Sequence, residues 1–181
     1  MRATVFTIGH STRTIPEFAA LLHEAAVDLV IDIRSIRRSR ANPQFNADAL
    51  PAALAEYRIA YQPVPALGGL RHHPKGTPPS PNDYWQVAAF RNYADYATTD
   101  AFRAGLDELE QLAGKHRCAI MCAEAVWWRC HRRIVADYLL GDGFDVRHIM
   151  GPGKIEPATL TPSAKRQDNG TLVYPAGSLQ N

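Results

Sequence analysis

Polar or reactive side chains follow three of the strands that this sequence predicts. The strands are expected at residues 3–8, 29–33 and 118–122, and the side chains at or just beyond their ends are His10, Ser11, Asp32, Arg34, Cys122 and Glu124. In open α/β sheets, ligands bind in the crevice outside the carboxyl ends of the strands. We therefore expect these groups and the nearby His131 to border a common cavity. The candidate catalytic groups are His10, Glu124, His131 and Cys122.

Two short segments concentrate positive charge at the same predicted edge of the sheet. The first, residues 34–40, holds four arginines, and the second, residues 129–133, opens a helix. Such arginines either form solvated loops or recognise phosphate or carboxylate, which the planar guanidinium binds through two parallel hydrogen bonds. We favour an anionic, phosphate-bearing small molecule or a nucleotide as the ligand. The expected ligand-binding residues are Ser11, Asp32, Arg34, Arg40 and Arg132.

A nucleic acid is the alternative partner. The formal net charge of +2 is too small to indicate one by itself. Trp127 and Trp128 lie beside the second basic segment, where they would either stack on bases or pack under a neighbouring loop. Basic groups that converge on one pocket favour an enzyme or small-molecule binder, whereas a long exposed basic stripe favours a nucleic-acid-binding accessory protein. Whether the protein is an enzyme is left open.

Cys122 offers a second kind of chemistry. A thiol at a strand end, just before a helix begins, lies where the helix dipole favours a thiolate, and the segment resembles the cysteine loops of tyrosine phosphatases and of rhodaneses. The interval from Cys122 to Arg129 is one residue longer than the phosphatase pattern, lacks glycine and includes Glu124, whose charge opposes a thiolate. A cysteine-dependent rhodanese-like or phosphatase-like enzyme and an inert buried thiol are both open interpretations.

His131 also has two interpretations. It shares a helical face with Ile134, Val135 and Tyr138, which is typical of a core residue, yet its place in the first turn is close to the expected crevice. His131, His10, Cys122 and Cys130 have spacings that match no standard zinc site. We predict no metal and no cofactor.

Strands alternate with helices along most of the chain. Further strands are expected at residues 59–63, 144–149 and 171–174, and helices at 14–25, 48–57, 83–97, 100–113 and 130–140, with Asp100 as an N-cap. This alternation predicts an α/β fold with an open, mainly parallel sheet and helices on both faces. The 181 residues suit one domain, expected at 1–150, and a C-terminal extension, 151–181, that either packs on the domain or is partly mobile.

Residues 63–82 are rich in proline and glycine and predict a long functional or mobile loop.

Two further features indicate the compartment of the protein and the state of its cysteines. Neither a signal peptide nor an apolar run of roughly 20 residues is evident, so we expect a cytoplasmic protein without a membrane partner, and no oligomeric state is indicated. We expect no structural disulfide: Cys118 and Cys122 lie at opposite ends of one strand, while Cys122 and Cys130 are closer to a possible pair.

Six short motifs occur in a fixed order along the chain: Thr7-Ile8-Gly9-His10-Ser11, Asp32-Ile33-Arg34, Ser39-Arg40, Leu67-Gly68-Gly69, Cys122-Ala123-Glu124 and Cys130-His131-Arg132. Together they resemble the bacterial family called domain of unknown function 488, over roughly residues 5 to 149. The resemblance implies a compact α/β fold and marks residues of these motifs as signature positions, but it implies no activity. Val126-Trp127-Trp128 departs from the family, whose members usually carry a polar or proline-containing stretch there.

Overall fold

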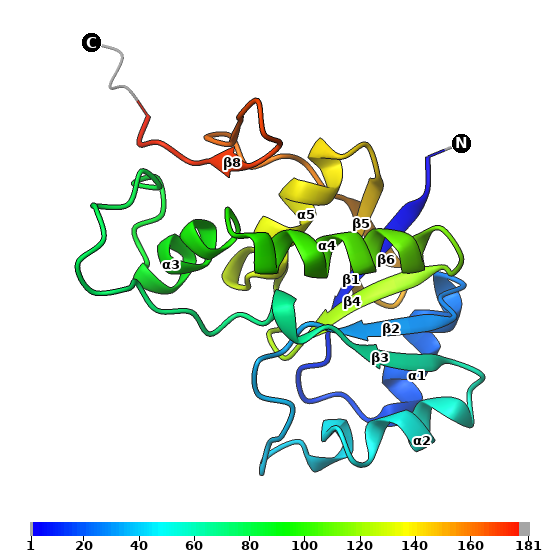
Figure 1. Ribbon diagram of the computed structural model, residues 1–181. Coiled ribbons are helices and arrows are strands. Elements are labelled where there is room, and N and C mark those ends of the chain that lie inside the picture. Colours follow the sequence, from blue (N-terminus) through cyan, green and yellow to red (C-terminus); the bar gives the residue numbers. More distant parts are fainter. Residues whose placement is uncertain (1, 178–181) are drawn as a thin grey trace.

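A six-stranded sheet with the strand order β3-β2-β4-β1-β5-β6 forms the centre of the molecule (Figure 1). The computed structural model describes residues 2–177. The strands are β1 (Thr4–Gly9), β2 (Leu29–Asp32), β3 (Ala60–Pro63), β4 (Cys118–Cys122), β5 (Asp145–Gly151) and β6 (Lys154–Pro157). The first five strands run parallel, and β6 runs antiparallel to β5. The predicted α/β fold with an open, mainly parallel sheet is confirmed.

Helices cover both faces of the sheet. They are α1 (Ile15–Glu24), α2 (Leu50–Ala55), α3 (Ala88–Tyr96), α4 (Asp100–Ala113) and α5 (Arg132–Gly141), with short 3-10 turns at Pro43–Phe45, Pro65–Leu67 and Trp127–Arg129. Helices α1 and α2 pack on one face, and α4 and α5 pack on the other (Figure 1). Every residue of β2 and β4 is buried. Cover on both faces explains why these two strands are nearly continuous apolar runs in the sequence.

One helix N-cap and one helix start differ from the sequence-based expectation. The N-cap of α4 is Thr99, whose hydroxyl accepts a hydrogen bond from the Phe102 N–H, and not Asp100, which begins the helix itself. Helix α3 begins at Ala88 rather than near Asp83. The segment before it pairs elsewhere, because the Tyr84 N–H donates to the Tyr174 carbonyl, more than 80 residues away in the chain.

The C-terminal extension packs on the rest of the chain as far as it is described. It supplies β6 to the main sheet and a small antiparallel hairpin, β7 (Lys165–Arg166) with β8 (Leu172–Val173). Tyr174 is fully buried, and its hydroxyl donates to Asp137 of α5. Whether residues 1–150 form a domain without this extension stays a prediction. Among residues 2–177, no helix has both the length and the apolar character needed to cross a bilayer.

Candidate functional site

The carboxyl ends of β1 and β4 lie side by side, at the point where the chain changes direction across the sheet. From β1 the chain continues through α1 towards β2, and from β4 it continues through α5 towards β5, so the two connections lie on opposite faces. A crevice is expected at such a switch point. The backbone pairing continues beyond β1, because His10 N–H donates to Cys122 O (2.8 Å) and Ser11 N–H to Ala123 O (3.0 Å).

Gly9 makes this close approach of the two strand ends possible. A Cβ atom at position 9 would lie 1.8 Å from the carbonyl oxygen of Glu124. No side chain fits there, so a glycine is required for the loop after β4 to fold against the end of β1. The same Glu124 carbonyl accepts a hydrogen bond of 2.8 Å from the Arg132 guanidinium.

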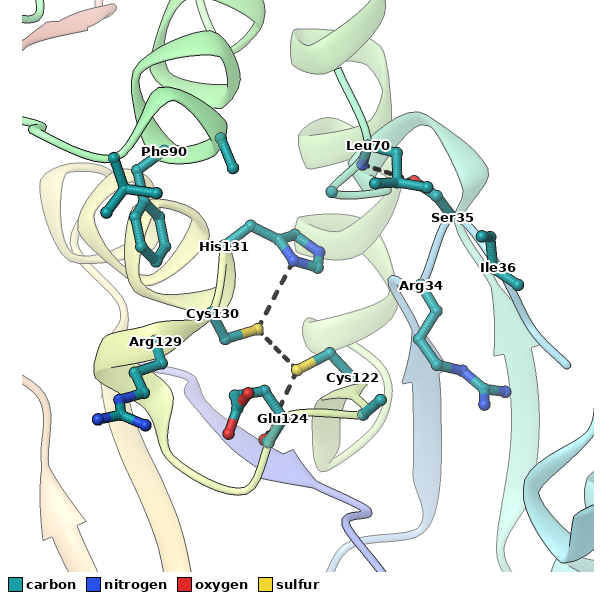
Figure 2. Close-up of a pocket in the computed structure, with 14 residues that line it drawn as sticks. Arg34, Ser35, Ile36, Leu70, Phe90, Cys122, Glu124, Arg129, Cys130 and His131 are labelled. Carbon is teal, nitrogen blue, oxygen red and sulfur yellow. Dashed lines mark hydrogen bonds between the residues drawn. The ribbon is translucent and has the colours of Figure 1, made fainter. Parts of the chain in front are cut away.

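Two thiols and an imidazole form a chain of contacts beside this junction (Figure 2). The sulfur atoms of Cys122 and Cys130 are 2.6 Å apart, and the Cys130 sulfur lies 3.6 Å from Nδ1 of His131. Nε2 of His131 donates a hydrogen bond of 2.7 Å to the carbonyl of Ile33. Because Nε2 carries that proton, Nδ1 of a neutral His131 is the free acceptor and faces the Cys130 thiol.

The two cysteines differ in their surroundings. Cys122 is the last residue of β4, and burial raises the pKa of its thiol well above the ordinary value, an effect to which the neighbouring Cys130 adds. Cys130 lies just before α5, and its sulfur accepts a hydrogen bond of 3.4 Å from the Arg132 N–H. Burial opposes ionisation of Cys130, but the hydrogen bond from Cys122 and the nearby His131 hold its pKa well below the ordinary value. The contacts of Cys130 with the His131 ring and with the Arg132 N–H therefore favour a thiolate on Cys130 over one on Cys122.

Arg132 contributes a buried positive charge next to these thiols. Its side chain is 1% exposed, and among the described residues it forms no salt bridge with a carboxylate, while its Nε lacks a hydrogen-bond partner. A buried charge without a counterion is costly. The charge of Arg132 favours the thiolate form of both Cys122 and Cys130. A thiolate on Cys130 would supply the missing negative charge.

The long loop predicted at residues 63–82 contacts the side chain of His131 at Gly69. A Cβ atom at position 69 would lie 2.6 Å from Nδ1 of His131, so the loop backbone packs directly on the imidazole. The hydroxyl of Tyr93 donates to the carbonyl of Leu67 (2.8 Å) and holds the loop to α3. Glycine at position 69 thus allows the loop to fix the ring without displacing it.

A second polar cluster, centred on Arg34, follows β2. Its Nε and Nη2 donate to the two oxygens of Asp32 (2.9 and 2.7 Å), and Nη2 also donates to Phe45 O (2.8 Å). Tyr61 donates to the same carboxylate at 2.5 Å. Nη1 of Arg34 lies 3.3 Å from Nε2 of His10. Four of the five guanidinium N–H groups are engaged in this way.

His10 is held in one neutral tautomer by this cluster. Its Nδ1 donates to the Ser11 carbonyl (2.8 Å), so Nε2 is the acceptor that faces Arg34. Its ring stacks on Phe45 with centroids 4.3 Å apart. Burial lowers the pKa of His10, and the charge of Arg34 adds to this shift. Proton transfer by His10 would therefore compete with a filled set of hydrogen bonds.

Two neighbouring cavities open between these clusters. The first, of about 400 Å³, is lined by residues that include Cys122, Cys130, His131, Arg129, Phe90 and Leu70. The second, of about 320 Å³, is lined by His10, Ser11, Thr12, Arg38, Ser39 and Asn42 among others. Arg34, Ile36, Ala123 and Glu124 line both, so the two cavities adjoin. Figure 2 shows the Arg34 guanidinium directed away from the thiols of the first cavity.

The structure brings most of the expected site residues to these cavities. Cys122 and His131 line the first, His10 and Ser11 line the second, and Arg34 and Glu124 line both. Asp32 and Arg132 are buried beneath them and line neither, and Arg40 is exposed outside both. The roles expected for these residues stay predictions.

Several residues at the cavities were not among the expected site residues. Cys130 is the foremost, and its place directly before His131 at a helix start was the available signal. The mouth of the first cavity is apolar: Ile36, Leu70 and Val87 are 64, 61 and 56% exposed. Exposed apolar side chains in loops carry no pattern that would have revealed them in the sequence. Within residues 2–177, no group of three or more His, Cys, Asp or Glu side chains could hold a metal ion.

The comparisons with known proteins give a family but no activity. Neither a curated protein nor a solved structure matches this chain. The model of one protein family matches residues 14–139, which is more than half of the chain and includes five of the six motifs described above. The chain therefore belongs to the family described as Domain of unknown function DUF488.

Proposed function

We propose that this protein is a cysteine-dependent enzyme in which Cys130 is the nucleophile. The observation that supports it is the contact chain from His131 Nδ1 through the Cys130 sulfur to the Cys122 sulfur, at the wall of a cavity of about 400 Å³. In this mechanism the Cys130 thiol passes its proton to His131. The resulting thiolate is stabilised by the Arg132 N–H, the Cys122 thiol and the buried Arg132 charge.

The lining of the cavity indicates the kind of substrate. Ile36, Leu70, Val87 and Phe90 surround the approach to Cys130, so the substrate would carry an apolar group as well as an electrophilic centre. Glu124 lines the same cavity with an exposed carboxylate, and the proton that His131 accepts from Cys130 can pass to a leaving group there. The apolar lining favours such a molecule over the bare phosphate of a phosphatase-like reaction.

Alkylation by iodoacetamide as a function of pH tests this proposal. Modification should occur at Cys130 with an apparent pKa below the value of about 8.5 for a free cysteine. His131→Gln should slow the reaction at pH 6.5 about tenfold, because it removes the proton acceptor and the imidazolium charge. Peptide mass spectrometry identifies the labelled thiol.

The matched control is Cys118→Ala. Cys118 is buried in β4, and burial raises its pKa to about 12, so removing it should leave the alkylation profile unchanged. Cys130→Ser should abolish the fast reaction. An apparent pKa of 8.5 or higher for Cys130, or preferential labelling of Cys122, would contradict the proposal.

Binding of an anionic small molecule is a second candidate, supported by the second cavity. Hydroxyl, amide and guanidinium groups of Ser11, Thr12, Arg38, Ser39 and Asn42 line it, and these are donors that suit phosphate oxygens. Arg38 is exposed, whereas Arg34 already binds Asp32. Arg38→Ala should therefore weaken binding of a nucleotide or sugar phosphate by one to two orders of magnitude, about 1.5–3 kcal/mol.

Equilibrium titration with a panel of nucleotides and sugar phosphates measures that effect, with Cys122→Ser as the control that leaves binding unchanged. Affinity that survives the loss of Arg38 would exclude this second candidate. Single-stranded oligonucleotides in the same panel address the nucleic-acid alternative, for which the exposed arginines 38, 40 and 129 are the available groups.

A further inference from the structure

We propose that Cys122 is the resolving partner of Cys130, so that the pair reduces a disulfide in a small substrate with an apolar body. This inference rests on the proposed nucleophile and adds the substrate class and the role of the second thiol. The observation behind it is that both cysteines are free and their sulfur atoms are 2.6 Å apart. A covalent S–S bond is about 2.05 Å long, so only a small side-chain movement separates the two sulfur atoms from bonding distance once the substrate disulfide oxidises the pair.

Both thiols are accessible to the same bound molecule. They line the first cavity together, although each is almost fully buried, at 3% exposed for Cys122 and 5% for Cys130. Cys122 is fixed at the end of β4, where its carbonyl pairs with the His10 N–H, and Cys130 is brought back to it by the 3-10 turn Trp127–Arg129. Cys118, the remaining cysteine, lies at the opposite end of β4 and takes no part in the proposed exchange.

The first step is attack by the Cys130 thiolate on one sulfur of the substrate disulfide. A bond forms between that sulfur and Cys130, and the substrate S–S bond breaks. The departing thiolate takes the proton held on Nδ1 of His131 and leaves as a thiol. Attack by a thiolate on a disulfide sulfur through such a mixed disulfide is the general route of exchange.

The second step uses Cys122. Its proton passes to the leaving sulfur, and its own sulfur attacks the sulfur of Cys130, which forms the Cys122–Cys130 disulfide, breaks the bond between Cys130 and the substrate, and releases the second substrate thiol. Two electrons have then moved from the cysteine pair to the substrate, which leaves as two thiols. A low-molecular-weight thiol or dithiol must afterwards return the pair to its reduced form.

The geometry assigns the two thiols different roles in the exchange reaction. Cys130 is close to His131 and accepts the Arg132 N–H, so it is the thiol prepared to attack first. Among the described residues, Cys122 forms no hydrogen bond with an imidazole, and it donates its hydrogen to Cys130 or to the Glu124 carbonyl. It therefore becomes reactive only when the sulfur of Cys130 has been made electrophilic by the substrate.

Reaction of the reduced full-length protein with the aromatic disulfide 5,5′-dithiobis(2-nitrobenzoate) tests the inference. The wild-type protein should release two equivalents of the coloured thiolate in the fast phase and retain no adduct, because Cys122 displaces the second one. Cys122→Ser should release one equivalent and retain one adduct on Cys130. Cys118→Ala should behave like the wild type, since its thiol is outside the cavity.

Three other outcomes are informative. One equivalent and a stable Cys130 adduct in the wild-type protein would overturn the resolving role of Cys122 but leave Cys130 as the proposed nucleophile. A lack of fast release at Cys130 would overturn both proposals. Cys122→Ala is a second variant, which also removes the hydrogen-bond donor at this position, and a native circular-dichroism spectrum of either variant, with the adduct lost all the same, would also count against the inference.

Discussion

Two clusters at the same edge of the sheet contrast in how completely their polar groups are bound. In the Arg34 cluster, a bidentate ion pair, a tyrosine hydroxyl, a carbonyl and an imidazole satisfy one another, and the charges of Arg34 and Asp32 cancel. The other cluster, called the cysteine chain below, consists of Cys122, Cys130 and His131. In it, His131 Nδ1 faces a thiol, and the neighbouring Arg132 cation has no carboxylate partner among the described residues. A satisfied network is rigid, whereas an uncompensated one can change its protonation state.

This contrast separates positioning from reactivity. Arg34 and His10 combine residue types that suggest chemistry, yet they hold the end of β2 against the loop at Phe45. The cysteine chain holds its members through fewer and weaker contacts and borders the larger, more apolar cavity. Perturbing the Arg34 cluster should therefore change stability, and perturbing the cysteine chain should change reactivity.

Arg34→Ala gives the largest expected effect. It leaves the Asp32 carboxylate, which is fully buried, without its cation, and removing one partner of a buried pair costs about 3–5 kcal/mol. Chemical denaturation measures this loss in the free energy of unfolding. Arg40→Ala, an exposed arginine of the same segment, is the control and should change stability by less than about 0.5 kcal/mol. Equal effects of the two variants would remove the distinction between the clusters.

Mild acid should destabilise the turn that precedes Cys130. His148 stacks on Trp127 with ring centroids 4.5 Å apart, and burial lowers its pKa to about 4 from 6.5. Because the unfolded chain binds this proton more readily, stability is complete above pH 6.5 and falls as the pH drops towards 4, by about 3 kcal/mol in total. Urea titrations at pH 7 and pH 4.5 should show the loss, and His148→Gln should reduce it; an unchanged pH dependence in that variant would contradict the assignment.

Tyr61→Phe should have a smaller effect on the Arg34 cluster. It removes one hydrogen bond to the Asp32 carboxylate but leaves the Arg34 pair, so we expect a loss of about 1.5 kcal/mol. Thermal unfolding measures it, with Tyr57→Phe, a ring that packs at the edge of the same core, as the control. No difference between the two tyrosines would mean that the hydroxyl of Tyr61 contributes nothing to the cluster.

Cys122→Ser should have the smallest effect on stability, below about 1 kcal/mol. The hydroxyl is nearly isosteric with the thiol and can still donate to Cys130 or to the Glu124 carbonyl. The same denaturation experiment measures it. A loss comparable with that of Arg34→Ala would show that the cysteine chain is a structural element like the Arg34 cluster.

The sequence revealed the elements whose signals are local. The strands at residues 29–33 and 118–122 were recognisable because burial on both faces requires continuous apolar runs, and the motifs at their ends do meet at one edge of the sheet. The start of α3 was not recognisable, because it depends on contacts of residues 84 and 85 with Tyr174 in the C-terminal extension.

Within the site, the difficulty was to assign partners to charged and reactive groups. The pairing of Arg34 with Asp32, two residues before it, was a local signal, but a guanidinium near a sheet edge suggests phosphate equally well. The contact of Cys122 with Cys130 depends on how the turn at residues 127–129 folds back, and spacing alone does not determine that.

The glycine at position 9 has a consequence for how this protein tolerates mutation. Gly9 lines neither cavity. Any larger residue at this position would displace the carbonyl of Glu124 and would thereby break the hydrogen bond that this carbonyl accepts from Arg132. A library of single substitutions scored for function should therefore show position 9 to be as intolerant as the cysteines themselves. Such a map would register a residue that acts purely by leaving room for its neighbours.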